Sequence, residues 1–558
     1  MKAFRFSSET ILLFGILTIA ILLRIGGVQF GLPFLYHADE PIIVNHALAF
    51  GMGDLNPHFF NIPPLVSYLL FICYGIYCLA GCAAGFFHSV RDFEQLFYLD
   101  PSSFYLIARL VFGVFLGTVS VYVLFRLVKR FGNAHSALWA AFFLAVNFLH
   151  VRDSHYVYAD IPLVLVLLLG FFVFFHVSES PSSWKGHLLA GGVIGLAAAT
   201  KYNGVFLVVP YVWICFRCVS WKQWLVFWFL AALGATGVFV VLNPYSILDH
   251  AFFIKEVAEQ SAANSGGMPW FHYLTYSLAG ALGWPMLILA ISGVSLALLS
   301  KNTRSQALAV FVIAYYLVLC RFGQPYDRYV LPLVPCMVIL AAEILDWLKI
   351  KSRLLFWVLI PFVILPSLIK TVHWDWLMSA PDVRTVAKNW VEANIAAGSR
   401  LALDGGFYMP RLAFSSQQLE EKKSRALSGF QSEAKMRRLD ALLAKSYQPS
   451  YELYFLSEDL KDAGFLFSEP RVSFDLKALK QKGIQYILVV DALGSGGELF
   501  NHALRKNADL IVTFSPYRNR EDLTIHDPQA LTGGPFLWSD ILLRDRGGYP
   551  ISVYRLRS

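Results

Sequence analysis

Two adjacent carboxylates begin the first polar segment of this chain. They are Asp39 and Glu40, in the run YHADEP at residues 36–41, directly after an apolar segment at about residues 11–23. A carboxylate at such a place can act as a general base toward an acceptor hydroxyl or amine. Asp39 can equally cap the helix expected over residues 42–50, because Asp suits helix N-caps and Pro suits the first helical turn. The residues alone leave both interpretations open.

A second acidic loop carries Asp153, His155 and Asp160, in the run RDSHYVYAD at residues 152–160. Asp160 directly precedes Ile-Pro and a new apolar segment, so it too can be a plain helix cap. Two acid-bearing loops on one surface would be a stronger sign of a reaction site than either loop alone. The topology of the chain therefore decides how these acids are interpreted.

Two segments carry a cation that could bind an anionic substrate. Lys201 lies in the run ATKYNG between two apolar segments, where it either extends to the membrane interface or faces an anionic partner. Arg328 and Tyr329 follow a polar turn at residues 322–327. An arginine at the end of a membrane span can contact lipid phosphate nonspecifically or hold one substrate phosphate bidentately.

The composition predicts that these residues are positioned by membrane-spanning helices. The 558 residues are 57% hydrophobic and only 15% charged, whereas soluble proteins have about 25% charged residues. The net charge of +8 does not indicate nucleic-acid binding, because Lys and Arg occur in short clusters between apolar runs. No small-residue cleavage site follows the first apolar segment, so we expect a retained first helix and a polytopic membrane protein.

Apolar runs of about 20 residues predict eleven spans. They lie near residues 11–23, 102–128, 135–150, 161–178, 187–200, 203–218, 222–243, 272–299, 305–320, 329–348 and 353–372.

The run at residues 62–87 is long enough to be a twelfth span, so its place has to be argued from charge. If it lies in the interface, the basic cluster at residues 126–130 joins the other basic loops on one face, as the positive-inside rule favours. We therefore expect a juxtamembrane or re-entrant segment that begins at Pro63 and Pro64. The acid-containing connections then all face outward: 31–101, 151–160, 200–203, 244–271 and 321–328.

The chain changes character after about Trp374, which an odd number of spans places on the outer side. Amphipathic helices here alternate with short strands, which predicts a small α/β domain over residues 375–558, after a membrane domain at 1–374. We expect helices at 382–395 and 475–482, the second capped by Asp475, and strands at 400–404, 484–490 and 509–514. The seven cysteines all lie in or beside apolar segments and show no zinc spacing, so no thiolate metal site and no disulfide of the tail is expected.

Six motifs in order carry a family resemblance. They are HADEP, NIPPLVSYLL, ARLVFGVFLGTVSVYVLFRLVKRFG, SHYVYADIPLV, GLAAATKYNGVFLVVP and DRYVLPLVP, spread over roughly residues 10–375. In this order they resemble the GT-C class of polyprenyl-phosphate-sugar-dependent glycosyltransferases, which includes protein O-mannosyltransferases and bacterial lipid A aminoarabinose transferases (glycosyltransferase family 39-like). The tail segments DVRTVAKNWVEANIAAGSRLALDGG and GIQYILVVD also resemble the extracytoplasmic α/β domain of many members.

The resemblance implies an inverting transfer of a sugar from a polyprenyl phosphate at the outer membrane face. Asp39 matches the acid taken as catalytic base, and Asp160 matches the acid near the reaction centre. Lys201 and the pair Arg328-Tyr329 fall in motifs associated with the shape of the site and the carrier phosphate. Several relatives have a Lys before the paired prolines where this chain has Asn61-Ile62, so Lys201, Arg328 or His58 is expected to contact the phosphate instead.

Further site residues are expected from the same loops. Glu40, Asp153 and His155 are candidate substrate-binding residues beside the two acids. A carboxylate and an imidazole could also hold a divalent cation, so Asp160 and His155 are the candidate ligands if a metal is used; no other cofactor is expected.

The expected partners are a polyprenyl-phosphate-linked sugar, a glycan, lipid or protein acceptor, and the bilayer. The expected location is the cytoplasmic (inner) membrane, crossed several times, with the site and the tail on the extracytoplasmic side. A transporter or flippase of a lipid-linked sugar is the main alternative. It should show inverted repeats and ionisable residues near span midpoints, whereas here the acids cluster at one face and no repeat is visible, apart from Arg109 inside a span. The other alternative is a non-catalytic scaffold of the same fold.

Overall fold

The computed structural model describes residues 7–263, 267, 269–404, 408–428, 433–457, 470–490, 497–527 and 536–557. Its contacts form two compact units. The first comprises Met1–Val28, Asp39–Gly75 and Tyr105–Asp375, and the second comprises Gln29–Ala38, Ile76–Phe104 and Trp376–Ser558. The predicted class, a helical membrane protein with a C-terminal α/β domain, is confirmed. The second unit also takes in parts of the first polar loop that the single sequence boundary at residue 374 assigned to the membrane part.

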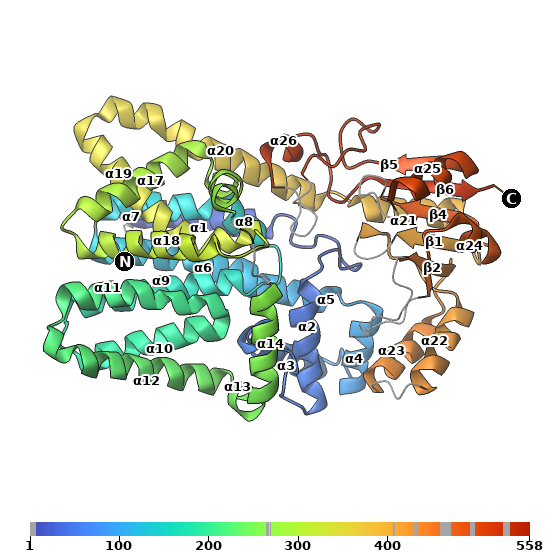
Figure 1. The fold of residues 1–558 in the computed structure, drawn as a ribbon, viewed down its shortest axis with the longest axis horizontal. Coiled ribbons are helices and arrows are strands. Elements are labelled where there is room, and N and C mark those ends of the chain that lie inside the picture. The colour runs from blue at the N-terminus through green and yellow to red at the C-terminus, as the bar shows by residue number, and fades with distance from the viewer. Residues whose placement is uncertain are drawn as a thin grey trace, which may run out of the picture. The chain divides into compact units, whose positions relative to one another are not determined.

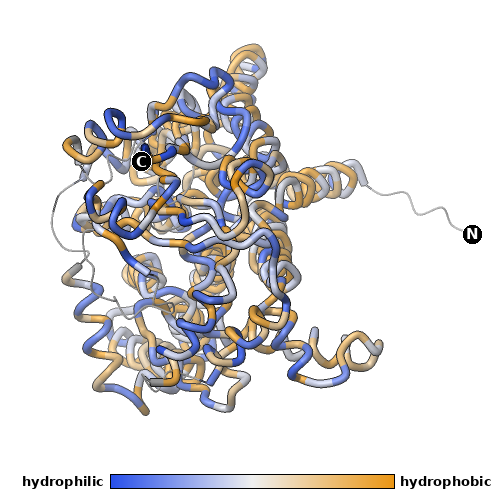
Figure 2. Tube along the Cα trace, turned by 90° about the vertical axis from the view of Figure 1, so that its right-hand side faces the viewer, coloured by the Kyte–Doolittle hydropathy of each residue, from blue (hydrophilic) through white to orange (hydrophobic). Residues whose placement is uncertain are grey.

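The first unit is a bundle of apolar helices (Figures 1 and 2). Its long helices are α1 (Ser8–Ile25), α6 (Leu116–Phe131), α7 (Ala134–Ala145), α9 (Asp160–Glu179), α10 (Trp184–Thr200), α11 (Val208–Cys218), α12 (Trp224–Leu242), α17 (Trp284–Leu299), α18 (Thr303–Leu319), α19 (Val334–Lys351) and α20 (Arg353–Ser379).

Shorter elements connect these helices. They are α2 (Glu40–Ala49), η1 (Phe50–Met52), α5 (Ser102–Ala108), η2 (Arg109–Phe115), α8 (Phe148–Asp153), η3 (Tyr202–Leu207), η4 (Trp221–Gln223), α13 (Tyr245–Leu248), α14 (His250–Ala263), α15 (Trp270–His272), η5 (Tyr273–Leu278), α16 (Ala279–Leu282) and η6 (Asp327–Leu333). Figure 1 shows α2 and α14 running across the ends of the bundle helices.

Seven helices of the described part are long and apolar enough to cross a membrane, and an eighth span results if the bent pair around Gly283 is counted as one. Three shorter apolar helices, at residues 134–145, 202–218 and 303–319, coincide with further predicted spans. The predicted span at 187–200 is α10, which packs against α12 through glycine. A Cβ added to Gly191 would lie 1.9 Å from the carbonyl oxygen of Ala231, so only glycine permits this approach.

Helix α3 (Leu65–Ala83) covers most of the segment that we expect at the membrane interface. Its length and composition also suit a span. Its first half packs on the chain just after α2, where the Phe50 ring lies 4.7 Å from Tyr68 and 6.1 Å from Phe71. Whether α3 lies in the interface or crosses the membrane therefore stays a prediction.

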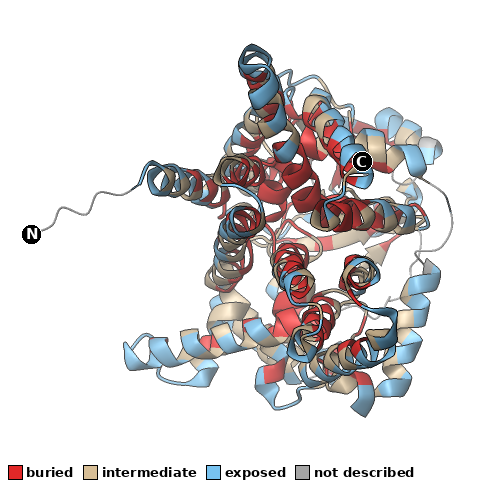
Figure 3. Ribbon diagram, turned by 90° about the vertical axis from the view of Figure 1, so that its left-hand side faces the viewer, coloured by how far each residue is buried: buried red, intermediate tan, exposed pale blue. Residues whose placement is uncertain are grey.

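Buried residues gather where the bundle helices meet, and exposed residues lie on the outside (Figure 3). Large apolar residues such as Leu225, Phe229 and Val241 of α12 are exposed in the protein alone. Exposed apolar side chains on the outside of an apolar helix bundle are what lipid contact requires.

The second unit is built on a six-stranded sheet with the order β3-β2-β1-β4-β6-β5. Strands β1 to β4 run parallel, and β6 and β5 continue the sheet antiparallel. The strands are β1 (Arg400–Asp404), β2 (Glu452–Leu456), β3 (Arg471–Val472), β4 (Tyr486–Val489), β5 (Ala508–Phe514) and β6 (Ile551–Leu556).

Helices cover both faces of this sheet, because alternate residues of each strand point to opposite sides. On one face, Leu401 and Leu403 pack with Val383, Ala387 and Val391 of α21 (Val383–Asn394). On the other face, Ala402 packs with residues of α24 (Leu476–Gln481) and α25 (Gly497–Asn507). The predicted helices at 382–395 and 475–482 and the three predicted strands are all confirmed, and Asp475 caps α24 as expected.

A helical hairpin, α22 (Ser416–Ser428) and α23 (Glu433–Lys445), also belongs to the second unit, as does the short α26 (Trp538–Ile541). The hairpin contacts α4 (Val90–Leu99), a helix of the first polar loop. Arg437 donates to Glu94 at 3.0 Å, and the Tyr447 hydroxyl donates to the carbonyl of Leu99 at 3.1 Å. These contacts explain why residues 76–104 belong to the α/β unit.

Candidate active site

Asp39 forms an ion pair with a residue that lies 289 positions further along the chain. It occupies the N-cap position of α2, but its side chain makes no capping hydrogen bond. Its carboxylate instead accepts a hydrogen bond from Nη1 of Arg328 at 2.7 Å. The side chains of Asp39 and Arg328 are 32% and 18% exposed, so a substrate can reach the pair. Helix capping therefore does not account for Asp39.

Arg328 is held on aromatic rings as well as on this carboxylate. It lies in η6 (Asp327–Leu333), and its Nη1 also donates to the Tyr158 hydroxyl at 2.8 Å. The guanidinium carbon lies 4.7 Å from the centre of the Tyr158 ring and 5.1 Å from that of Tyr326. Burial raises the pKa of Tyr158 well above its usual value, so its hydroxyl stays protonated. The arrangement leaves a preorganised cation at the surface of the site.

Asp160 and Lys201 form a second ion pair. Asp160 is the first residue of α9. The N-cap position of this helix is occupied by Ala159, so Asp160 is not the capping residue. The Asp160 carboxylate accepts from the Lys201 ammonium at 2.6 Å. The ammonium also lies 5.4 Å from the centre of the Tyr329 ring. Lys201 thus has a carboxylate partner, which an ammonium extending to the interface would not need.

The two ion pairs lie together. Tyr329, which faces Lys201, directly follows Arg328 along the chain. Arg328 interacts electrostatically with both carboxylates, those of Asp39 and Asp160. The structure therefore brings together five of the residues singled out in the sequence: Asp39, Asp160, Lys201, Arg328 and Tyr329. Four of them form two acid–base pairs, and the side chains of Lys201 and Arg328 are 20% and 18% exposed.

Glu40 lies next to Asp39 in sequence but has a different environment. Its carboxylate is buried and accepts from Nε and Nη2 of Arg109 at 2.8 and 2.6 Å. It also accepts from the backbone N–H of Val157 at 3.1 Å. Glu40 thus connects the start of α2, the π-helical turn η2 that begins at Arg109, and the loop before Asp160.

Asp153 and His155 are buried as well. Arg152 donates to Asp153 at 2.9 Å and also pairs with Asp327. Burial raises the pKa of Asp153 to about 6, although the charge of Arg152 beside it lowers that pKa. The two ring nitrogens of His155 face the backbone carbonyls of Val151 and Gly26. These contacts brace the second acidic loop from within.

His58 lies apart from the two ion pairs. Its exposed imidazole contacts the carboxylate of Asp54 at 2.8 Å. The surrounding segment rests on α14, because the N–H of Phe60 donates to Glu256 at 2.8 Å. No described contact brings His58 to the cluster around Asp39.

The divalent cation considered at Asp160 and His155 stays a prediction. Among the described residues, no group of three or more His, Cys, Asp or Glu side chains could hold a metal ion. The Asp160 carboxylate is engaged by Lys201, and His155 contacts backbone carbonyls.

Sequence reasoning missed three residues that organise the site: Arg109, Tyr158 and Asp327. Arg109 gave a signal, since a lone arginine within an apolar span needs a buried acidic partner. Tyr158 and Asp327 gave none, because nothing local indicates that one supports Arg328 and the other pairs with Arg152.

The opposite end of the bundle gathers the basic loops. Glu179, at the end of α9, accepts from Arg130 at 2.9 Å and from Arg304 at 3.0 Å. Asp160 begins the same helix, and 20 helical residues span about 30 Å. One helix thus has the acidic site at one end and the basic loops at the other.

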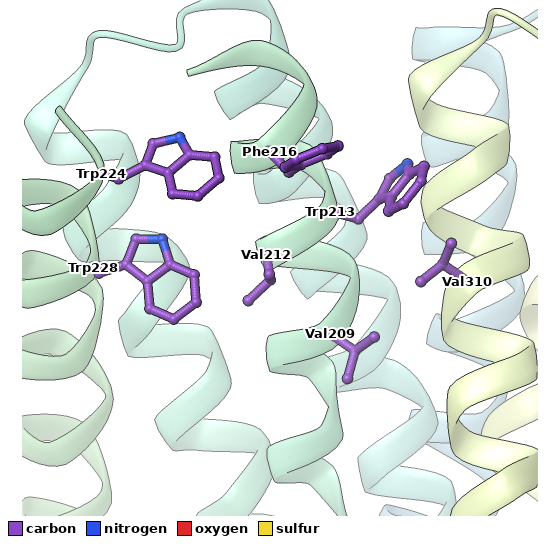
Figure 4. Close-up of a pocket in the computed structure, with 7 residues that line it drawn as sticks. All are labelled: Val209, Val212, Trp213, Phe216, Trp224, Trp228 and Val310. Carbon is purple, nitrogen blue, oxygen red and sulfur yellow. The ribbon is translucent and has the colours of Figure 1, made fainter. Parts of the chain in front are cut away.

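An apolar groove of about 570 Å³ lies elsewhere in the bundle, between α11, α12 and α18. Figure 4 shows three tryptophans among its lining residues, which are Val209, Val212, Trp213, Phe216, Trp224, Trp228 and Val310. None of these side chains is ionisable, so the groove has no group for acid–base chemistry.

Comparisons with known proteins agree with this architecture. Residues 90–256 match the family model described as dolichyl-phosphate-mannose-protein mannosyltransferase. The matched segment includes Asp160 and Lys201 but neither Asp39 nor Arg328. No curated protein sequence matches the chain.

Solved structures show a similar fold. ArnT from Cupriavidus metallidurans bound to undecaprenyl phosphate aligns with a TM-score of 0.51 and 13% identity, over 90% of this chain and 95% of that one. Its apo form aligns with a TM-score of 0.50 and 13% identity, over 91% and 96%. An oligosaccharyltransferase from Archaeoglobus fulgidus tethered with an acceptor peptide has a TM-score of 0.49 and 12% identity, over 90% and 72%. On the two ArnT matches, the chain has the GT-C membrane glycosyltransferase fold, with a segment similar to the protein mannosyltransferase family within it.

Proposed function

We propose that this chain is an inverting glycosyltransferase that moves a sugar from a polyprenyl phosphate to a glycan, lipid or protein acceptor. The observation that carries the proposal is the cluster in which Asp39 and Asp160 meet Arg328 and Lys201. A reaction of this kind needs a base for the acceptor and cations for the departing phosphate. The fold and the matched family segment support the same reaction class.

In the proposed reaction Asp39 is the base. The acceptor oxygen forms a bond to the anomeric carbon from the face opposite the phosphate, and the bond from that carbon to the phosphate oxygen breaks. The acceptor proton passes to the Asp39 carboxylate. Attack from the opposite face inverts the anomeric configuration. Asp160 orients sugar or acceptor hydroxyls beside the reacting carbon.

The cations act on the phosphate. A sugar phosphodiester carries one negative charge, and the polyprenyl phosphate that leaves carries more, about −1.5 to −2 near neutral pH. Lys201 and Arg328 therefore interact more strongly with the departing group than with the bound donor, which accelerates the reaction.

The pairing of Asp39 with Arg328 gives the donor a role in preparing the base. Nη1 of Arg328 donates to an oxygen of the Asp39 carboxylate, so that oxygen is not open to the acceptor hydroxyl while the contact lasts. When the donor phosphate engages Arg328, the ion pair at 2.7 Å loosens and Asp39 becomes available to the acceptor. Proton removal is then tied to the presence of the donor.

The proposed location is the cytoplasmic membrane, with the site on its extracytoplasmic side. The chain is a multi-pass membrane protein, and its Lys- and Arg-rich loops lie at the end of the bundle opposite to the site. Basic loops favour the cytoplasmic side. Glu40, Asp153 and His155 then act as positioning residues behind the reacting groups.

Deleting the gene is expected to remove one glycoconjugate from the cell envelope and to leave its unmodified acceptor behind. Mass spectrometry of envelope lipids, glycans and glycoproteins would identify both molecules, and re-expression of the wild-type chain should restore the product. The purified protein, offered undecaprenyl-phosphate esters of mannose, glucose, galactose and 4-amino-arabinose together with the deletion strain's envelope, should use one of these donors. An unchanged envelope and no transfer from any donor would contradict the proposal.

Replacing Lys201 with Gln is expected to weaken the binding of undecaprenyl phosphate roughly 10- to 100-fold, since a hydrogen bond to a charged group contributes about 1.5–3 kcal/mol. Glutamine can still donate to Asp160, so the local structure should persist. Binding would be measured in lipid nanodiscs. Lys129→Gln is the matched control, because Lys129 pairs with Glu9 at the other end of the bundle. Equal binding by the Lys201 variant and the control would exclude Lys201 as a phosphate ligand.

A further inference from the structure

The apolar groove between α11, α12 and α18 is open to the outside of the bundle. Figure 4 shows Phe216 and Trp224 at one end of the groove and Val209 at the other. From Val209 to Phe216, α11 rises about 10 Å. The side chains of Phe216 and Trp228 are 59% and 43% exposed in the protein alone. In a membrane, an exposed apolar groove on a helix bundle faces lipid chains.

The loop that joins α11 to α12 bounds one end of this groove. It follows Phe216 and precedes Trp224, whose rings lie 6.0 Å apart. The thiol of Cys218, the last residue of α11, interacts with the side chain of Thr303. The next residue, Arg304, belongs to the basic loops at the end of the bundle opposite to Asp160. This end of the groove therefore lies among the basic loops.

Two exposed cations, Arg217 and Lys222, lie between the two aromatic residues that bound the groove. Neither of them forms an ion pair within the described part of the chain. In contrast, Arg130 and Arg304 at the same end of the bundle share the carboxylate of Glu179. Cations without a protein partner at the edge of an apolar groove suit an anionic headgroup whose hydrocarbon chain lies in the groove.

The wall of the groove also contains a hydrogen-bond donor without an acceptor. The indole Nε1 of Trp213 is buried and has no hydrogen-bond partner among the described residues. The indole of Trp224, by comparison, donates to the carbonyl of Val219 at 3.2 Å. A buried donor without an acceptor is costly, and an ester carbonyl of a glycerolipid would supply one. Tryptophans are enriched at membrane interfaces because their rings are apolar and carry one polar N–H.

We propose that this groove is a binding site for one anionic glycerophospholipid. One acyl chain lies in the groove along α11. The phosphate contacts Arg217 and Lys222, and an ester carbonyl accepts from the indole of Trp213. A free phosphate would use the two cations but leave the apolar groove and the indole without a partner. The site lies at the end of the bundle opposite to Asp160, so the inference does not depend on the proposed reaction.

The test offers the full-length protein, purified in detergent, dioleoyl-phosphatidylglycerol or dioleoyl-phosphatidylcholine and counts bound lipids by native mass spectrometry. One phosphatidylglycerol should bind about tenfold more tightly than phosphatidylcholine. The double variant Arg217→Gln/Lys222→Gln should bind phosphatidylglycerol about 30-fold more weakly, because each cation near an anionic headgroup contributes about fivefold. Arg126→Gln is the matched control, since Arg126 is an exposed arginine of α6, which does not line the groove; it should bind as the wild type does.

A second variant tests the groove itself. Val212→Trp fills the groove without changing a charge and should weaken the binding of both lipids about tenfold. Thermal unfolding gives an independent readout, because a lipid that binds only the folded protein raises its Tm. Phosphatidylglycerol should raise the Tm of the wild type and of Arg126→Gln, but not that of the double variant.

Three results would overturn the inference. The first is equal binding of phosphatidylglycerol by the double variant and by Arg126→Gln. The second is equal binding of the two lipids by the wild type, which would show that the headgroup is not selected. The third is a different occupant of the groove: a polyprenyl phosphate that copurifies with the wild type, or a dimer of this chain, that is lost in Val212→Trp.

Discussion

The Asp39→Asn variant is expected to transfer sugar about a thousandfold more slowly than the wild type while folding normally and binding the donor lipid. A positioned general base contributes about 10²- to 10⁴-fold to a rate, and an amide cannot take the acceptor proton. The asparagine side-chain oxygen can still accept the bond that Arg328 now gives to the carboxylate at 2.7 Å. Release of undecaprenyl phosphate from the active donor, measured in nanodiscs, would give the rate.

Two further variants sharpen this measurement. Asp39→Glu keeps a carboxylate but displaces it by about one methylene, so part of the activity should persist. Glu9→Gln removes an acid that pairs with Lys129 among the basic loops and should transfer at the wild-type rate. Asp39→Asn with normal transfer would rule out the base assignment, and a much larger loss in Asp160→Asn would transfer that role to Asp160.

Glu40 is not expected to replace Asp39 in the variant, although it is the next residue. Its carboxylate is fully buried and takes two hydrogen bonds from Arg109 and one from Val157. Moving it to the acceptor would break all of these bonds inside the protein, where an unpaired charge costs several kcal/mol. The adjacent acids of the sequence thus have separate functions.

The helices of the membrane unit could be predicted because their signal is local. Most long apolar runs correspond to one helix, although the run at 272–299 is broken at Gly283, and the charges at the ends of a helix indicate its direction, as in α9 between Asp160 and Glu179. In the tail, Asp475 could be assigned as a cap from its own neighbours, and β1 was predicted at residues 400–404, as the structure has it. Patterns of this kind do not depend on the rest of the chain.

The arrangement of the α/β unit could not be predicted from such patterns. Strand β1 lies between β2 and β4, which are far apart in sequence, and the order of a sheet depends on which hydrophobic faces can be covered together. The contact of α4 with the hairpin α22–α23 joins residues more than 300 positions apart. The assignment of residues 29–38 and 76–104 to this unit is therefore visible only in three dimensions.

In the site, too, single residues could be predicted from the sequence but their partners could not. The sequence indicated Asp39, Asp160, Lys201 and Arg328 individually, because charges beside apolar spans are costly unless they have a purpose. It could not indicate that Asp39 meets Arg328 across 289 residues, or that Asp160 meets Lys201. The substrate-binding role expected for Asp153 and His155 stays a prediction, and their burial gives them a supporting position.

The largest loss of stability is expected from Arg109→Met. The Arg109 and Glu40 side chains are 0% exposed and joined by two hydrogen bonds, and Arg109 also donates to the carbonyl of Val28 at 2.8 Å. Removing one partner leaves a buried charge without compensation, which costs about 3–5 kcal/mol. Unfolding of the purified protein by increasing mole fractions of SDS in mixed micelles would measure the change in free energy.

The double variant Glu40→Met/Arg109→Met separates stability from function. Two apolar side chains of similar length can replace a buried ion pair at little net cost, so most of the lost stability should return. About 1 kcal/mol should stay missing, because the N–H of Val157 loses its acceptor. A double variant as unstable as Arg109→Met would show that the charges are not each other's main compensation.

Transfer by this double variant is the decisive comparison. Glu40 directly follows Asp39, and its carboxylate accepts a hydrogen bond from Val157, which lies three positions before Asp160. Methionine cannot make that bond, so the loops that carry the two acids lose their direct link even when the fold is restored. We therefore expect stability to recover and the transfer rate to stay at least tenfold low, since reacting groups must hold their geometry to within about 1 Å. Recovery of both would mean that packing alone sets the distance between the acids, and the buried pair would then serve the fold and not the reaction.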